Sequence, residues 1–263
     1  MKLGFIGCGN MAMAIIGGIV SSKKIAAEDI IVSNPTNEKL LKIQNDFKVN
    51  ITNDNLKVID VDYLFLCVKP NIVDEVLREI KPMLNEKVVV ISIAAGIKIS
   101  QIENSLKGNF KVIRLMPNTP ALVNASMTSL TVNVNVSEVE KKAVWDLLTS
   151  IGKVVEVSED LIDAIIAIAG SAPAYIYMMI ESMADAGVSY GLKRDVAYML
   201  AAQTVMGSGK MVLETKMHPA SLKDMVTSPK GTTIEAVKKL EETGFRSAII
   251  QAMDACYNKS KSL

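Results

Sequence analysis

Up to about residue 157, short apolar runs alternate with segments of helical character. Leu3, Phe5 and Ile6 form the first run, which predicts a strand buried in a parallel sheet. Further strands are expected at residues 29–33, 63–68, 88–93, 111–115, 130–134 and 154–157, and helices at residues 72–81, 99–106 and 138–149. Such alternation is typical of a doubly wound α/β sheet, in which ligands bind at the carboxyl ends of the strands.

From Ser158 onward the strand pattern gives way to helices, expected at residues 160–168, 174–187, 195–213, 220–226, 233–242 and 247–259. These segments are rich in Ala, Met and Ile on more than one face, and a helix that is apolar all round has to be buried. Methionines such as Met178 and Met206 can serve as gap-filling core residues. Because this half is too small to bury every such face by itself, we expect it to pack against a second copy in an obligate homodimer.

Composition narrows the class of protein without identifying it. A length of 263 residues predicts one or two domains, and a net charge of +1 argues against nucleic acid as the main partner. The three cysteines form no C-x-x-C pair, which favours a reducing cytoplasm. We find no cleavable signal pattern at the start and no apolar run long and clean enough to span a bilayer. A soluble cytoplasmic protein with no membrane partner is therefore expected.

The sequence contains one histidine, His218. It precedes Pro219, a position that favours a helix-entry role over a catalytic one. A multi-histidine metal site cannot be built from one histidine, and a Ser–His triad would have to use His218, so we expect no metal and no such triad.

A glycine motif follows the first apolar run. Gly7-Cys8-Gly9 and then Ala12 match the pattern G-x-G-x-x-A, between a predicted strand and a predicted helix, which is the context in which this motif binds a dinucleotide pyrophosphate. Gly7 permits the tight turn, Gly9 lets the backbone approach the phosphates, and Ala12 allows close helix–strand packing. The helix N-terminus supplies free N–H groups and partial positive charge. The plainer alternative is an ordinary strand–helix turn.

The end of the second strand bears on the choice of cofactor. An NAD-preferring site usually has Asp or Glu there to hold the ribose 2′-hydroxyl. Here residues 33–37 are SNPTN, and the first carboxylate is Glu38. A neutral loop of hydroxyls and amides, with Lys39 and Lys42 nearby, suits a 2′-phosphate, so we expect NADPH to be preferred, with NADH possible. Thr36 is also a candidate helix N-cap.

Residues 219–233 are dense in hydroxyls and helix breakers between two predicted helices. Free N–H groups at the mouth of the second helix, with four hydroxyls counting Thr227, predict a seat for a carboxylate. A simple N-cap by Thr232 or Thr233 is the alternative, and it needs only one hydroxyl.

Several motifs resemble pyrroline-5-carboxylate reductases along essentially the whole chain and in the right order. They are GFIGCGNMA at residues 4–12, RLMPNTPALV at 114–123, GSAPAY at 170–175, DAGV at 185–188 and LKDMVTSPKGTT at 222–233. The resemblance implies a Rossmann-like NADP-binding domain at residues 1–157 and a helical dimerisation and substrate domain at residues 158–263. It also implies self-association as a homodimer or an oligomer of dimers. The implied reaction is NADPH-dependent reduction of 1-pyrroline-5-carboxylate, a small-molecule substrate, in the last step of proline biosynthesis.

The resemblance also implies roles for particular residues. The positions similar to cofactor-contacting ones are Ile6, Gly7, Cys8, Gly9, Asn10, Met11, Asn34, Asn55, Val68, Lys69, Pro70, Asn71, Ala94, Ala95 and Gly96. The positions matching the substrate loop are Ser228, Gly231, Thr232 and Thr233. The loop would hold the substrate carboxylate, and the Thr233 hydroxyl, as the catalytic contact, would meet the ring nitrogen. The protein then mainly orients a reactive imine carbon over the nicotinamide.

Two positions depart from the family pattern: Lys230 stands where a small residue, usually Gly, is found, and Ala172 stands where Gly is common. Two other functions remain open on the sequence. A hydroxyacid dehydrogenase would need a catalytic lysine in the region of residues 170–175, where this chain has none. In the second alternative, the chain is a non-catalytic NADP-binding regulatory protein, and Lys230 marks the decay of its substrate loop.

Overall fold

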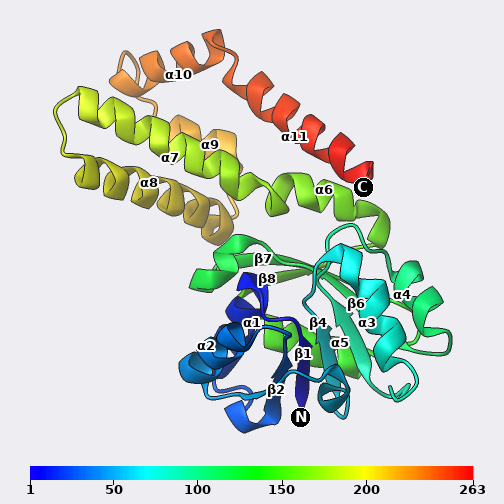
Figure 1. Ribbon diagram of the computed structural model, residues 1–263. Coiled ribbons are helices and arrows are strands. Elements are labelled where there is room, and N and C mark those ends of the chain that lie inside the picture. The colour runs from blue at the N-terminus through cyan, green and yellow to red at the C-terminus, as the bar shows by residue number, and fades with distance from the viewer. Residues whose placement is uncertain (263) are drawn as a thin grey trace. The chain divides into compact units, whose positions relative to one another are not determined.

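The computed structural model describes residues 1–262, which form two compact units. The first unit is Met1–Gly170 together with the chain from Ser260, and the second is Ser171–Lys259. The first holds every strand of the described residues, and the second is helical (Figure 1).

The first unit is built on one eight-stranded sheet in the order β3-β2-β1-β4-β5-β6-β7-β8. Its strands are β1 (Leu3–Ile6), β2 (Ile30–Ser33), β3 (Asn50–Thr52), β4 (Tyr63–Leu66), β5 (Val89–Ser92), β6 (Lys111–Met116), β7 (Ser126–Val132) and β8 (Gly152–Glu156). All neighbouring pairs are parallel except β6 and β7. The strand order reverses at β1, between β2 and β4, and such a switch point is where open α/β sheets bind ligands.

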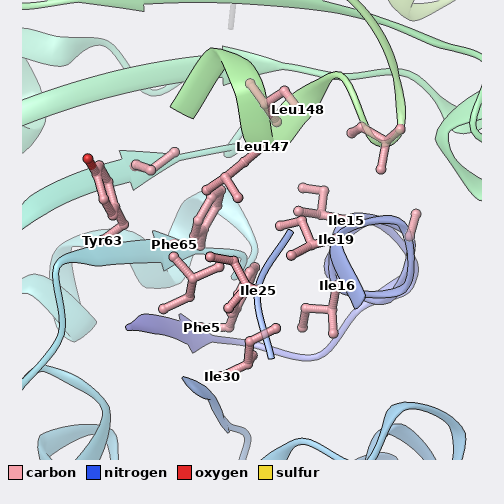
Figure 2. Packing of buried hydrophobic residues seen from close by; sticks show 14 of the residues in the cluster. Phe5, Ile15, Ile16, Ile19, Ile25, Ile30, Tyr63, Phe65, Leu147 and Leu148 are labelled. Carbon is pink, nitrogen blue, oxygen red and sulfur yellow. The ribbon is translucent and has the colours of Figure 1, made fainter. Parts of the chain in front are cut away.

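Successive side chains of the central strands are buried on opposite faces of this sheet. Phe5 and Phe65 belong to one apolar cluster, whereas Leu64 and Leu66 belong to the other. Figure 2 shows the first cluster, in which the Phe5 and Phe65 rings stack with centroids 4.5 Å apart. Burial on both faces explains why the strands appear in the sequence as continuous apolar runs rather than as alternating ones.

Five longer helices cover the sheet: α1 (Asn10–Ser21), α2 (Asn37–Phe47), α3 (Val73–Ile80), α4 (Ile99–Leu106) and α5 (Glu138–Leu148). Helices α1, α2 and α5 contribute to the cluster around Phe5, and α3 and α4 contribute to the cluster around Leu64. The expected strands and helices of this half are confirmed within a few residues at their ends. The three-residue strand β3 was not expected, because it is too short to give a pattern.

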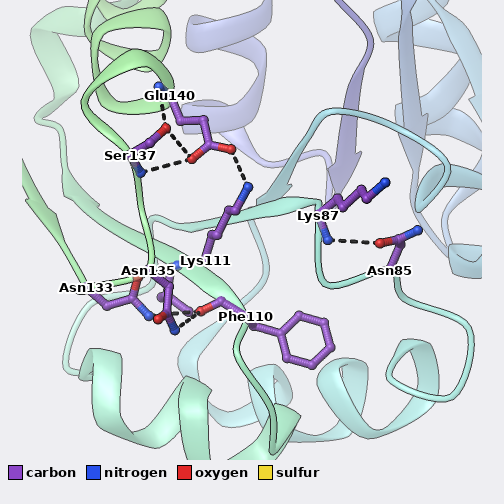
Figure 3. Close-up of polar contacts among 9 residues, drawn as sticks. Asn85, Lys87, Phe110, Lys111, Asn133, Asn135, Ser137 and Glu140 are labelled. Carbon is purple, nitrogen blue, oxygen red and sulfur yellow. Dashed lines mark hydrogen bonds and ion pairs between the residues drawn. The ribbon is translucent and has the colours of Figure 1, made fainter.

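Polar contacts fix the edge of the sheet that lies opposite the carboxyl ends of its parallel strands (Figure 3). The Asn133 amide donates to the Phe110 carbonyl at 2.9 Å, and its oxygen accepts the Val112 N–H at 3.1 Å. Lys111 pairs with Glu140 at 2.5 Å, and Glu140 also closes a capping box with Ser137 at the start of α5. These bonds tie the start of β6 to the end of β7.

After β8 the chain runs through η5 (Glu159–Leu161), α6 (Ile162–Ile165) and a π-helical turn, η6 (Ile166–Gly170). One regular helix was expected at residues 160–168, and the structure instead divides this stretch into three helical types. These residues belong to the first compact unit, which ends at Gly170. The functional domain boundary expected at residues 157 and 158 stays a prediction. Within the first unit, the Ser260 hydroxyl donates to the Asp163 carboxylate at 2.5 Å.

The second unit consists of α7 (Ala172–Ser189), α8 (Arg194–Thr215), α9 (Pro219–Met225), α10 (Thr232–Glu242) and most of α11 (Phe245–Lys261). All five helices were expected. Helices α7 and α8 lie side by side (Figure 1), and their buried residues are small: Ala184 and Gly187 on α7, and Ala197 and Ala201 on α8. A Cβ added to Gly187 would stand 3.3 Å from the Ala197 Cβ, so small residues set how closely the two helices approach.

Much apolar surface of the second unit is exposed in the single chain. Met178, Met199 and Met206 are each about 60% exposed, at 65%, 63% and 59%. They therefore do not fill the core of their own unit, which was one of the two explanations considered for the methionines. Their exposure is consistent with the other explanation, packing against a second copy.

One helical stretch, Glu159–Ser189, is by length and composition apolar enough to cross a membrane. An 18-residue window within it has a mean hydropathy of 1.6, and 11% of that window is buried. The expectation that no apolar run reaches this length is therefore wrong. A stretch of this kind is weak evidence for a membrane span, since helices of soluble proteins also have such composition.

Candidate functional site

The glycine turn after β1 has the geometry that its sequence predicts. Gly7 has φ +99°, in the region that favours glycine, and its N–H donates to the Ser33 carbonyl at 2.8 Å. A Cβ at this position would lie 2.5 Å from the Cys67 carbonyl oxygen. Gly7 is thus required both by its backbone conformation and by the close approach of the chain after β4.

Gly9 is the N-cap residue of α1, and no side chain caps this helix. A Cβ added to Gly9 would meet no atom within 4 Å apart from its own neighbours in the chain, so the space before α1 is open. Because no side chain caps α1, its first N–H groups are free to bind an anion. The first turn also contains no acidic side chain that would repel one. Ala12, three residues on, is 1% exposed and packs closely as expected.

Asn34 joins the glycine turn to the end of β2. Its side-chain oxygen accepts the Cys8 N–H at 3.2 Å, and its amide nitrogen donates to the Thr36 carbonyl at 3.3 Å. With 9% exposure, Asn34 uses both ends of its amide within the protein. The structure therefore gives Asn34 a bracing role at the turn, and its direct contact with a cofactor stays a prediction.

Two further asparagines brace the same edge of the sheet. The Asn55 oxygen accepts the Ser33 hydroxyl at 2.7 Å, and its amide donates to Glu79 at 2.8 Å. Asn53 donates to the Asn34 carbonyl at 2.9 Å. Ser33 belongs to the loop that the sequence predicts for the 2′-phosphate, and the structure adds the bonds by which Ser33 and Asn53 brace this edge.

The turns after β4 and β5 lie at the same carboxyl edge, because β1, β4 and β5 are parallel neighbours. Lys69, Pro70 and Asn71 are exposed there, and Pro70 begins the short helix η3 (Pro70–Ile72). After β5, Ala94 is buried and Gly96 has φ +76°. The structure thus brings together every sequence-predicted cofactor residue at one edge of one unit.

The loop after β2 carries no carboxylate before Glu38, as the sequence shows. Thr36 is the N-cap residue of α2 by backbone position, yet its hydroxyl makes no capping bond. The charge of Lys39 acts on the glycine turn: burial raises the pKa of Cys8, and Lys39 partly offsets that rise. The free α1 N-terminus, the open space at Gly9 and this carboxylate-free loop fit a dinucleotide with a 2′-phosphate.

A cavity of about 720 Å³ in the first unit shares Gly96 with the turn after β5. Its wall contains Arg114, which is 6% exposed and pairs with Glu159 at 2.9 Å. The same carboxylate oxygen accepts the Ile99 N–H at 2.7 Å, so Glu159 ties β6, the start of α4 and η5 together. This contact could not be predicted from the sequence, because Arg114 and Glu159 are 45 residues apart in the chain.

The predicted substrate residues lie in the second unit, around the start of α10. Ser228 and Gly231 close a turn in which the Gly231 N–H donates to the Ser228 carbonyl at 3.0 Å. Gly231 is the N-cap residue of α10, and no side chain caps that helix. The alternative that Thr232 or Thr233 caps the helix is therefore wrong, since both stand inside its first turn.

The hydroxyls of this loop differ in their availability. Thr227 donates to the Lys223 carbonyl at 2.6 Å, so its hydroxyl serves the end of α9. Ser228, Thr232 and Thr233 lie beside the uncapped N–H groups of α10. Hydroxyls and free N–H groups together can bind a carboxylate. Lys230 is exposed and has φ +55°, a backbone conformation that glycine adopts without strain.

The remaining candidate residues have structural roles. His218 is the N-cap residue of α9, and its Nδ1 accepts the Ala220 N–H at 3.2 Å, so its helix-entry role is confirmed. Cys8, Cys67 and Cys256 are free thiols, and burial raises the pKa of Cys67 well above its usual value. Residues 1–262 contain no group of three or more His, Cys, Asp or Glu placed to hold a metal.

Two protein-family models match parts of the chain. Residues 159–263 match the one described as pyrroline-5-carboxylate reductase dimerisation, and residues 2–96 match the one described as NADP oxidoreductase coenzyme F420-dependent. The chain is 47% identical over 263 residues to the pyrroline-5-carboxylate reductase of Escherichia coli (strain K12), covering 100% of this chain and 98% of that protein.

Solved structures of pyrroline-5-carboxylate reductases are also similar to this chain. A pyrroline-5-carboxylate reductase from Coxiella burnetii matches with a TM-score of 0.93 and 37% identity, over 99% of this chain and 97% of that one. The pyrroline carboxylate reductase of Plasmodium falciparum with NADP bound matches with a TM-score of 0.89 and 35% identity, over 100% of this chain and 97% of that one.

Proposed function

Because this chain belongs to the pyrroline-5-carboxylate reductase family, we propose that it reduces 1-pyrroline-5-carboxylate to L-proline with NADPH, the last step of proline biosynthesis. It is an oxidoreductase that acts on a carbon–nitrogen double bond. The observation that carries this assignment within the structure is a pair of uncapped helix N-termini, each entered through a glycine. One suits the pyrophosphate of a dinucleotide, and the other suits the carboxylate of a small acid.

The protein's contribution to the reduction is binding and orientation. NADPH, when bound, supplies the hydride. The α1 N-terminus behind Gly7 and Gly9 would hold the pyrophosphate, and the loop after β2 would receive the 2′-phosphate. Asn34 and Asn55 would support this site from behind, through the bonds that they make to Cys8 and Ser33.

Ser228, Gly231 and Thr232 would bind the substrate carboxylate at the start of α10. Protonation of the ring nitrogen makes the adjacent carbon ready to take hydride. The Thr233 hydroxyl would accept a hydrogen bond from this protonated nitrogen. The carbon–nitrogen double bond then becomes a single bond, and the nitrogen keeps its proton as the amine of proline. No histidine or metal is needed for this chemistry, since the imine is already electrophilic.

Self-association follows from the family match over residues 159–263 and from the exposed apolar surface of the second unit. The finer assembly that we propose is an obligate homodimer, in which that surface is covered by the second copy. Light scattering at micromolar concentration tests it, and a folded monomer would contradict it. Three free cysteines without a disulfide are consistent with the cytoplasmic location that we also propose.

The experiment that tests the function follows the NADPH absorbance band with purified protein and 1-pyrroline-5-carboxylate. We expect the band to fall only when both substrates are present, with proline as the product. The carboxylate-free loop after β2 predicts a higher kcat/KM with NADPH than with NADH. A protein that binds NADPH without turning over the imine would instead be a regulatory binding protein. Turnover of a hydroxyacid in its place would indicate a dehydrogenase.

A further inference from the structure

The chain enters the second unit through an interrupted helix. The π-helical turn Ile166–Gly170 ends the first unit, and α7 begins at Ala172, with Pro173 in its first turn. Between them Ser171 lies outside both elements. The division of the chain into two compact units therefore coincides with a break in helical hydrogen bonding.

The break leaves the carbonyl of Ala169 without its usual helical donors. In an α-helix this carbonyl would accept the N–H of the residue four positions later, which is Pro173 and has none. In a π-helix the donor would be Ala174, but the Ala174 N–H donates to the Ser171 carbonyl at 3.0 Å. A carbonyl in this position needs a donor from elsewhere in the chain.

Asn118 supplies that donor. Its side-chain amide donates to the Ala169 carbonyl at 3.0 Å, and its oxygen accepts the Met127 N–H at 3.0 Å and the Ser126 hydroxyl at 3.1 Å. The side chain is 9% exposed, so water competes little for these bonds. Asn118 follows β6, at the same carboxyl edge of the sheet as the turn after β5.

We propose that Asn118 is a positioning residue for the reduction, because its amide replaces the missing N–H of Pro173 and fixes the last helical turn before the substrate-binding unit to the cofactor edge of the sheet. The inference rests on the proposed function, since that function assigns the cofactor to one unit and the imine to the other. Hydride transfer requires the reacting atoms to be about 3–3.5 Å apart, and a misplacement of about 1 Å can cost about 100-fold in rate. The bond from Asn118 to Ala169 fixes the point at which the chain leaves the first unit.

Asn118→Asp isolates the bond to Ala169. The carboxylate still accepts from Met127 and Ser126, but it has no hydrogen to give the Ala169 carbonyl. We expect kcat to fall about tenfold or more, while the Kd for NADPH changes less than about twofold. Hydrogen exchange of the amides at residues 170–175 should become faster in the variant, which is a measurement independent of activity.

Pro173→Ala offers a rescue, because this substitution restores a backbone N–H that can donate to the Ala169 carbonyl. If Asn118 acts through this carbonyl, Asn118→Asp should lower kcat much less in the Pro173→Ala background than in the parent, by about threefold or less. An equal loss in both backgrounds would overturn the proposal, since Asn118 would then act by another route.

Asn133 is the matched control for stability. It is 8% exposed, and its side chain also makes three hydrogen bonds, to Phe110, Glu103 and Val112, at the opposite edge of the sheet. Asn133→Ala and Asn118→Ala should lower the melting temperature similarly, whereas only Asn118→Ala should lower kcat. If Asn133→Ala and Asn118→Ala lost kcat equally, Asn118 would be a stability residue and the proposal would be overturned. The same conclusion would follow if Asn118→Ala and Asn118→Asp both failed to fold while Asn133→Ala folded. An inactive parent protein would instead refute the proposed function, and the exchange measurement would still test the bond to Ala169.

Discussion

Ser228 lies directly over Gly231: a Cβ added to Gly231 would overlap the Ser228 hydroxyl oxygen, and the Gly231 N–H donates to the Ser228 carbonyl at 3.0 Å. The absence of a side chain at one residue therefore allows the hydroxyl of another to approach the start of α10. Hydroxyl and free N–H groups share one small volume as a result, which is what a carboxylate seat requires.

Gly231→Ala should displace the Ser228 hydroxyl and weaken the substrate seat. We expect the KM for the imine to rise about tenfold or more, near 1.4 kcal/mol, with the NADPH Kd unchanged because the cofactor residues belong to the other unit. Steady-state kinetics and a separate NADPH titration measure the two quantities. An Ala variant with the parent's KM would show that the Ser228 turn does not form the seat.

Gly9→Ala should separate cofactor binding from folding. The added Cβ meets no atom within 4 Å apart from its neighbours in the chain, so the melting temperature of the cofactor-free protein should change little. The same methyl would stand before the α1 N-terminus, so the Kd for NADPH should rise about tenfold or more and the stabilisation by NADPH should shrink accordingly.

Gly7→Ala is the contrasting variant, because φ +99° and the Cys67 carbonyl both oppose a side chain there. It should destabilise the protein itself, by about 1–3 kcal/mol. Calorimetry that found Gly9→Ala as destabilising as Gly7→Ala would contradict the assignment of Gly9 to the phosphate site.

Thr233→Ala should lower kcat/KM for the imine and leave NADPH affinity nearly intact. Loss of one neutral hydrogen bond costs about 0.5–1.5 kcal/mol, roughly threefold to tenfold, and more if a buried partner is left unpaired. Thr233→Val keeps the branched shape without the hydroxyl and should be impaired to the same degree. Recovery of activity in the Val variant would make Thr233 a packing residue.

Lys230 departs from the family pattern in side chain while its backbone takes the conformation that glycine favours, with φ +55°. Lys230→Gly should relieve that backbone and change the substrate KM by less than about fivefold, because an exposed ammonium adds only about 0–1 kcal/mol. Lys230→Ala is the control, since it removes the charge and keeps the strained backbone. A rise in KM of about tenfold in both variants, erased by high salt, would make Lys230 a carboxylate ligand.

The sheet and the glycine turn could be predicted because their causes are local. A strand buried on both faces needs a continuous apolar run, and a turn with positive φ needs glycine, so β1 and Gly7 are visible in the sequence. Strand β3 was missed because three residues, two of them partly exposed, give no pattern.

Contacts that join distant segments could not be predicted in this way. Asn118 and Ala169 are 51 residues apart, and Arg114 and Glu159 are 45 apart. Pro173 is visible in the sequence, but only the structure shows which carbonyl it leaves without a donor. The capping alternative for Thr232 and Thr233 failed for a related reason, since the position of a cap depends on backbone angles that a row of hydroxyls does not determine.

The most direct test of the central claim is a label-transfer experiment with NADPH in which both hydrogens at C4 of the nicotinamide ring are replaced by deuterium. Incubation of the protein with this cofactor and 1-pyrroline-5-carboxylate should give proline that carries the deuterium at C5, as read by mass spectrometry and NMR. Oxidation of the cofactor without labelled proline, or proline formed without the label, would contradict hydride transfer to the imine carbon and with it the function assigned to this chain.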